Sequence, residues 1–355
     1  MKRTLMTAAL LAAWGGASAQ SAVTIFGVVD ASYSYGSGST SNKTQLNSGS
    51  NTSSRVGFRG TENLGGGMSA SFWLEGQFNT DNGAGLATNT NNQTNGGAIA
   101  GIGGGQGFTF GRRSTVSLHA PWGEIRMGRD FTSHYLNRSL ADVFAVVGVG
   151  ASQPHVGTLG GTVATRASNM IGYYLPASVG PIYGQAQIYY GENNSGAANS
   201  SDGKGYSVRV GYNQGPINVS VAQGNTKYTA GDITSTSVAA LYNAGVVRLS
   251  SAYLRDVNAA PANVTGKGYT LGAIVPMGPH EIKLSLSKYG RNTGLKPETK
   301  KTSLGYVHNL SKRTALYATY ARVSNSGGAT TALNGSVTAA NSSSSGYDLG
   351  VRHTF

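Results

Sequence analysis

Two short strands and an unusually long loop are predicted in residues 107–169, which read GFTFGRRSTVSLHAPWGEIRMGRDFTSHYLNRSLADVFAVVGVGASQPHVGTLGGTVATRASN. Apolar and polar residues alternate from Phe108 to His119 and again from Glu124 to Arg129, with a Pro- and Gly-containing turn between them. The next strand begins only near Ala164. A loop this long is uncommon in a compact domain unless it has a function of its own.

The long loop contains an apolar run, Val143 to Val147, which a loop on the protein surface would leave in water. We therefore expect the loop to fold back into a wide β-barrel and to narrow its bore. On this interpretation Arg113 and Arg166 lie across the narrowed passage from the loop. The rest of the chain forms the wall that holds this constriction in place.

Alternation with a period of two recurs along the chain and predicts sixteen strands. Short and long connections alternate between them, as in transmembrane barrels with short periplasmic turns and long external loops. Strands of about ten residues also suit a tilted crossing of the hydrocarbon core. The predicted strands are 21–35, 53–61, 68–78, 108–119, 124–129, 164–175, 181–191, 204–213, 216–226, 233–243, 245–256, 265–276, 280–290, 298–308, 313–324 and 343–355.

The predicted fold is therefore all-β: a 16-stranded antiparallel transmembrane β-barrel whose long third loop folds into the pore. Sixteen strands leave an aqueous lumen. The Gly-, Ser- and Asn-rich stretches 36–52 and 81–106 are predicted to be exposed loops, and no long helix is expected.

The first nineteen residues have the pattern of a secretory signal peptide. Lys2 and Arg3 precede a short apolar segment, and Ala17 to Ala19 forms an A-x-A site before Gln20. The apolar segment is too short to cross a bilayer as a helix. We expect residues 1–19 to be removed and residues 20–355 to form one barrel domain.

The composition restricts the possible functions. The chain has no cysteine, which excludes disulfides and zinc–thiolate sites, and no cofactor or metal is expected. Its net charge is +13, or +11 without Lys2 and Arg3. Such a charge suits nucleic-acid binding, attraction to an acidic surface or a basic channel interior. Because the basic residues are dispersed at one or two per strand and the protein is exported, we favour the channel interior over nucleic acid.

Five blocks of sequence resemble the trimeric general porins of Gram-negative bacteria, most closely the anion-preferring branch. The C-terminal strand, which ends on Phe355, also resembles the assembly signal of outer-membrane barrels. The blocks are VTIFGVVD (23–30), SRVGFRGTE (54–62), GRRSTV (111–116), GEIRMGRD (123–130) and LGYVHNLSKR (304–313).

This resemblance implies a homotrimer in the outer membrane, surrounded by its lipid, that lets small hydrophilic solutes diffuse passively and prefers small inorganic and organic anions. It also implies arginines on the wall that face acidic groups near the inward loop. By local motif the arginines correspond to Arg55, Arg112 or Arg113, and Arg166, and the acids to Glu75 and Asp142.

Alternation along the strands separates inward from outward candidates. Val116 and Leu118 are expected to face lipid, which turns Arg113 inward and leaves Arg112 near the rim or displaced by a bulge. An arginine on the outer face at the bilayer midplane costs about 2–4 kcal/mol. The same parity turns Arg55, Arg59 and Glu75 inward. The predicted constriction residues are therefore Arg55, Arg59, Arg112, Arg113, Arg166, Glu75 and Asp142.

An exported barrel could also serve three other classes of function. An outer-membrane esterase requires a nucleophile and base in reach, but none of the six histidines lies in a catalytic motif, so we expect no enzyme. A substrate-specific channel is the main alternative, because Trp73, Tyr183 or Tyr189 could form a sugar-binding slide. A structural anchor would show no conductance at all.

Overall fold

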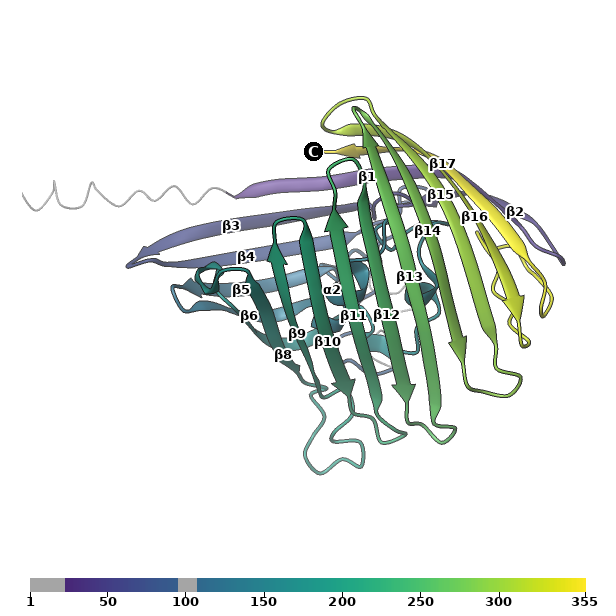
Figure 1. Cartoon of the computed structure of the whole chain (residues 1–355). Coiled ribbons are helices and arrows are strands. Elements are labelled where there is room, and N and C mark those ends of the chain that lie inside the picture. Colours follow the sequence, from purple (N-terminus) through teal and green to yellow (C-terminus); the bar gives the residue numbers. More distant parts are fainter. Residues whose placement is uncertain (1–22, 95–106) are drawn as a thin grey trace, which may run out of the picture.

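The computed structural model describes residues 23–94 and 107–355, so the predicted signal peptide lies outside the described residues. Strands follow one another around a ring that closes where β1 pairs with β17 (Figure 1). The strands are β1 (Thr24–Ser37), β2 (Lys43–Ser48), β3 (Arg55–Gly65), β4 (Met68–Gln77), β5 (Arg113–Ala120), β6 (Gly123–Phe131), β7 (Arg166–Tyr174), β8 (Ile182–Tyr189), β9 (Gly205–Gln214), β10 (Ile217–Thr226), β11 (Ile233–Asn243), β12 (Arg248–Asn258), β13 (Val264–Met277), β14 (His280–Arg291), β15 (Glu298–Asn309), β16 (Thr314–Ser326) and β17 (Ser344–Thr354).

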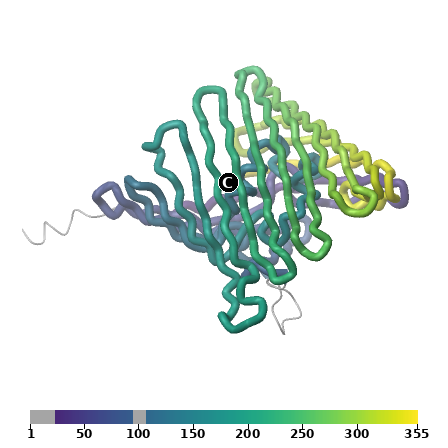
Figure 2. The backbone as a smooth tube through the Cα atoms, turned by 60° about the horizontal axis from the view of Figure 1, so that its bottom comes forward, coloured from purple at the N-terminus to yellow at the C-terminus, as the bar shows by residue number. Residues whose placement is uncertain are grey.

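The ring has sixteen positions because β2 and β3 share one of them. β2 pairs with residues 31–36 of β1, and β3 pairs with residues 24–28 of the same strand. All pairings are antiparallel, which confirms the predicted barrel. Figure 2 shows the succession of hairpins from the purple N-terminal strand to the yellow C-terminal strands.

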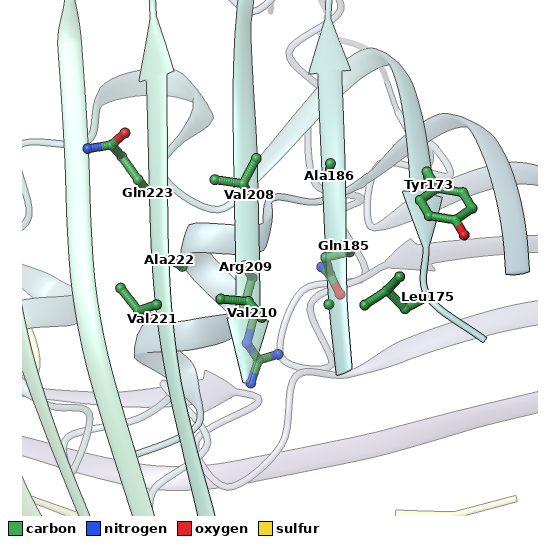
Figure 3. Close-up of a pocket in the computed structure, with 11 residues that line it drawn as sticks. Tyr173, Leu175, Gln185, Ala186, Val208, Arg209, Val210, Val221, Ala222 and Gln223 are labelled. Atoms are coloured by element: carbon green, nitrogen blue, oxygen red, sulfur yellow. The ribbon is translucent and has the colours of Figure 1, made fainter. Parts of the chain in front are cut away.

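Alternate side chains point into the lumen and out toward lipid. On β9 and β10, Val208, Val210 and Val221 are 40–50% exposed on the outer face, whereas Ser207 and Ala222 are buried on the inner one. Figure 3 shows this stretch of wall, with Ala186 on the strand between the valines and Tyr173. A strand that crosses lipid needs this division, because its outer side chains have no water to contact. No helix of the described residues is both long and apolar enough to cross a membrane.

Three predictions about the wall are corrected. Strand β2 lies in the predicted loop 36–52. Because this strand extends beyond the apolar band, its sequence KTQLNS is polar and lacks the alternation from which strands were predicted. Strand β5 begins at Arg113 instead of Phe108, since Phe108 packs edge-on against Phe110 and crosses β4 at Gly76. In the predicted exposed loop 81–106, the side chain of Asn92 is buried and donates to the carbonyls of Ser168 and Tyr190; residues 95–106 lie outside the description.

Residues 132–165, here called the inward loop, fold inside the ring as predicted. The loop contains two short helices and a 3-10 turn: α2 (Ser133–Ser139), α3 (Gln153–Val156) and η1 (Gly161–Val163). A second 3-10 turn, η2 (Ala177–Val179), lies in the β7–β8 turn. Glycines in the wall make room for the loop: a Cβ on Gly224 would lie 2.2 Å from Nδ1 of His134, and one on Gly305 would lie 2.5 Å from Cε1 of Phe144. At these two positions the wall leaves room for a loop side chain because it has no side chain of its own.

Candidate functional site

An open space in the lumen lies between the tip of the inward loop and strands β3–β7, where the constriction is predicted. It is a chamber of about 500 Å³, here called the constriction chamber. Its wall side carries Arg55, Gln77, Arg112 and Arg166, and its loop side carries Tyr135, Leu136, Ala145, Val146, Val147 and His155. Charged groups therefore line one side of the passage and mostly apolar groups the other.

A single carboxylate among the described residues balances the guanidinium groups of this chamber. Oε1 of Glu75 lies 2.5 Å from Nε of Arg112 and 3.5 Å from Nε of Arg55. Glu75 Oε2 also accepts a hydrogen bond of 3.1 Å from Nε1 of Trp73. Glu75 is thus fully engaged on the wall, and the chamber keeps a net charge of +2 from its three arginines and one acid.

Arg166 is the arginine of this chamber that has no acidic partner within the part of the chain that the structure describes. Its guanidinium lies 4.1 Å from the ring centroid of Phe131, and its Nε donates to the carbonyl of Arg112 over 2.8 Å. Phe131 in turn stacks on Tyr135 of the inward loop at 4.8 Å. The side chain is therefore held in place by an aromatic face and a backbone acceptor, which leave its charge uncompensated.

The tip of the inward loop has an unusual backbone. Ala145 and Val146 both have positive φ angles, 54° and 58°. For a β-branched residue such as Val146 this conformation is a genuine outlier. Strain of this kind persists only where the surroundings determine the conformation, and here the two residues line the chamber whose opposite side carries the arginines. The predicted placement of the apolar run opposite Arg166 is therefore observed.

Asp142 does not face the arginine cluster, which corrects its predicted position. Its carboxylate accepts hydrogen bonds from the backbone N–H groups of Phe144 and Ser152, at 2.9 and 2.8 Å. It thereby ties the two ends of the loop tip together. The neighbouring cation is Lys301 of β15, whose Nζ donates to the carbonyl of Ala151 over 2.7 Å.

Arg59 and Arg113 lie in a second chamber, nearer the short-turn end of the barrel. This periplasmic chamber has about 550 Å³ and lies outside the constriction where we predicted both residues. Arg113 and Arg59 approach the ring of Trp73 to 4.7 and 5.1 Å. Arg113 also pairs with Asp130 at 3.4 Å. The predicted inward direction of Arg113 is correct, but it lies below the constriction.

Arg112 reaches the constriction because it precedes the first residue of β5. The chain bends at this position, so the alternation that governs Arg113 to Ala120 does not apply to it. Both arginines of the pair therefore point into the lumen, at different heights. Of the two predicted alternatives for Arg112, a place near the rim or a displacement by a bulge, the bend before β5 corresponds to the displacement.

The inward loop is anchored by buried polar groups of the wall that the sequence did not reveal. Asp256 of β12 is fully buried and accepts hydrogen bonds from Thr158 Oγ1 at 2.7 Å and from the backbone N–H of Leu159 at 3.1 Å. Gln187 of β8 accepts from both N–H and Oγ of Ser133. No local motif marks such residues, because their partners are about 50 to 100 positions away.

Two histidines, the buried His134 and the half-buried His155, give the inward loop a predicted pH dependence. Burial lowers the pKa of His134 to about 3 and that of His155 well below its usual value, and the charge of Arg138 acts in the same direction on both. The unfolded chain binds these protons near pH 6.5 while the folded chain does not, so stability is lost as the pH falls from 6.5 toward 3.

The expected loss from His134 is about 1.4 kcal/mol per pH unit over this range, and His155 adds a loss of the same sign. Thermal unfolding in detergent at pH 7.5 and 4.5 measures it. The double variant His134→Gln, His155→Gln should lose less stability between these pH values than the wild type. An equal loss in both proteins would contradict the assignment.

Comparisons with known proteins agree with this geometry. A family profile described as Gram-negative porin matches residues 7–328. Outer membrane porin protein 32 of Delftia acidovorans is 34% identical over 377 residues and covers 100% of both chains. An outer membrane porin protein of Bordetella pertussis is 27% identical, over 90% of this chain and 93% of its own length.

Among solved structures, the anion-selective porin from Comamonas acidovorans superimposes with a TM-score of 0.82 at 31% identity, covering 95% of this chain and 100% of that one. Porins are channels of the outer membrane and not enzymes. The closed barrel, its inward loop and these similarities together show that the chain belongs to the Gram-negative porin family.

Proposed function

We propose that the protein is a passive diffusion channel for small hydrophilic solutes that favours anions, and that the constriction chamber sets this preference. The observation that supports it is the charge of that chamber. Arg55, Arg112 and Arg166 face a loop tip without a charged side chain, and among the described residues Glu75 is the one acid that forms an ion pair with any of these three arginines. The selectivity of the Comamonas acidovorans porin named above supports the same assignment.

The magnitude of the effect follows from simple electrostatics. A unit charge about 6 Å from a passing ion contributes roughly 3 kcal/mol at an effective dielectric of about 20. Salt at physiological strength screens charges beyond about 8 Å, so the residues of the constriction dominate the selection. Because Glu75 offsets one arginine, we expect a modest preference for anions rather than exclusion of cations.

A substrate-specific channel is supported less well. Tyr189 is 1% exposed and cannot contact a solute. Tyr183 is engaged with Arg209 and Asn218 through its hydroxyl, and Trp73 is flanked by two guanidinium groups. These three residues therefore form no continuous aromatic slide.

Conductance of the refolded protein in planar bilayers tests the proposed function. A general channel should conduct in proportion to salt concentration and show no block by sugars or organic acids. Saturation, or block by one solute, would instead show a specific channel, and absence of conductance would show an anchor. We also propose a homotrimer, on the family resemblance, which sedimentation in detergent tests directly.

Replacing Glu75 by glutamine should increase anion preference and reduce stability. The variant removes the negative charge of the constriction chamber and leaves Arg55 and Arg112 without their carboxylate. Breaking such a buried pair costs about 3 kcal/mol or more. The anion-to-cation permeability ratio and the thermal midpoint should therefore move in opposite directions. A lower permeability ratio would contradict the charge balance described above.

A further inference from the structure

Two histidines lie side by side on the outer face of the barrel, at the short-turn end of strands β14 and β15. His280 is the first residue of β14, and His308 is its cross-strand partner on β15. Both side chains are half-buried and have the strand parity of the exposed Leu284, Leu304 and Tyr306, so they project away from the lumen. Residues that face one another in an antiparallel pair have Cβ atoms about 5 Å apart. The two imidazoles can therefore approach the same point.

Two polar atoms crowd around one imidazole nitrogen. Nδ1 of His280 lies 3.0 Å from Nδ1 of His308 and 2.7 Å from the hydroxyl oxygen of Tyr306. The rings of His308 and Tyr306 both stack on that of His280, with centroids 4.6 and 5.7 Å away. An imidazole nitrogen carries either one lone pair or one hydrogen, so it makes one full hydrogen bond. The two contacts of His280 Nδ1 therefore cannot both be full hydrogen bonds.

A metal cation between these atoms satisfies them without a hydrogen. Neutral imidazole offers a lone pair at Nδ1 or Nε2 and is the commonest metal ligand in proteins. In the described ranges 23–94 and 107–355, neither His280 nor His308 is engaged by a carboxylate within salt-bridge distance. The two lone pairs and the hydroxyl oxygen together form a donor set of two nitrogens and one oxygen.

The distance between the two nitrogens indicates which metals fit. With metal–nitrogen bonds of about 2.05 Å, a separation of 3.0 Å corresponds to an angle of about 95° at the metal. A tetrahedral zinc ion requires a wider angle. Angles near 90° are those of the tetragonal geometry that copper(II) and nickel(II) adopt with nitrogen and oxygen donors. Of the two, copper(II) binds such donors more tightly.

The backbone holds the two histidines together before any metal binds. The backbone N–H and the side-chain amide of Asn309 both donate to the carbonyl of Pro279, over 2.8 and 3.2 Å. These bonds join the residue before His280 to the residue after His308. Short turns mark the periplasmic end of a transmembrane barrel, and Tyr306 is 43% exposed there. Dissolved metal therefore reaches the site from the periplasm.

We propose that His280 and His308 bind a divalent transition-metal ion, copper(II) most tightly, through their Nδ1 atoms. The hydroxyl of Tyr306 is the third donor, and water completes the coordination. The bound ion joins β14 to β15 at the periplasmic rim, outside the lumen, so the site is independent of the proposed channel function. No sequence motif indicates it, because the two histidines are 28 positions apart. The proposal departs from the expectation, based on the sequence, that the protein holds no metal.

Titration of copper(II) chloride into the folded, untagged protein in detergent tests the proposal. Calorimetry should show one saturable site per chain, and electron paramagnetic resonance should show two coordinated nitrogens. His280→Gln and His308→Gln should each bind copper about 100-fold more weakly, because the second ligand of a chelate binds intramolecularly. The matched control is His353→Gln on β17. His353 lies on the same outer face near the same rim, with its Nδ1 2.9 Å from Oγ1 of Thr314, so this variant should bind as the wild type does.

Absence of a saturable site in the wild type, or coordination by a single nitrogen, would overturn the proposal. Equal weakening in His280→Gln and His353→Gln would also overturn it, because the copper would then be bound by isolated surface imidazoles. Wild-type affinity in His280→Gln would have the same consequence. If His280→Gln fails to fold, His308→Gln supplies the same comparison, and the resonance spectrum of the wild type needs no variant.

Discussion

Replacement of Arg166 by alanine is expected to lower the anion-to-cation permeability ratio several-fold. Among the described residues, Arg166 is the constriction arginine without an acidic partner, and its guanidinium is held against Phe131 on the surface of the chamber. At an effective dielectric of about 20, the loss of one charge about 6 Å from the ion path corresponds to roughly 3 kcal/mol before screening. Salt and the mobility of the ion reduce this figure, so a change of about one decade is an upper bound.

The reversal potential across a salt gradient measures this change, and two variants serve as controls. Arg313→Ala removes an equal charge at an exposed turn outside the lumen and should not alter selectivity. Arg113→Ala removes a charge that Asp130 already offsets at 3.4 Å, so its effect should be smaller than that of Arg166→Ala. If the variants Arg166→Ala, Arg113→Ala and Arg313→Ala all had the selectivity of the wild type, the constriction chamber would not be the part of the pore that selects ions.

Replacement of Asp256 by alanine is expected to release the return half of the inward loop from the wall. The carboxylate accepts four hydrogen bonds, from Thr158, Leu159, Tyr289 and Ser235. Arg138 of the loop is buried beside it, so the variant also leaves that cation without its acidic neighbour. Removing one member of such a buried network costs about 3–5 kcal/mol.

The expected result in single-channel recordings is a larger and noisier conductance than that of the wild type, because the loop no longer narrows the bore reproducibly. Glu281→Ala is a control that also removes one carboxylate, since Glu281 accepts a hydrogen bond from Arg248 at the short-turn end of the barrel wall. A quiet conductance of wild-type size in Asp256→Ala would show that other contacts suffice to hold the loop.

The wall of the barrel could be predicted from the sequence because alternation with a period of two is a local pattern. It located the strands from β1 to β17 apart from β2, whose polar residues extend beyond the membrane and lack the pattern. It also predicted the inward direction of Arg113, but could not predict that of Arg112, which lies just before the strand where no alternation operates.

The interior arrangement was predicted less completely, because it depends on contacts between distant residues. The apolar run Val143–Val147 identified the inward loop, yet Asp142 faces its own backbone and not the arginines. Asp256 gave no sign of its role, since a buried acid in a strand resembles any other inward polar residue. The net positive charge was assigned to the lumen alone, whereas five cations of β12–β16 lie on the outer face, at Arg255, Lys267, Lys288, Lys300 and Arg322.

The sign of the reversal potential of the wild-type protein, measured in a planar bilayer between unequal concentrations of potassium chloride, tests the central claim most directly. With three arginines and one acid around the constriction, the potential should have the sign that chloride permeation produces. A potential of the opposite sign, which means that potassium passes more readily, would contradict the account.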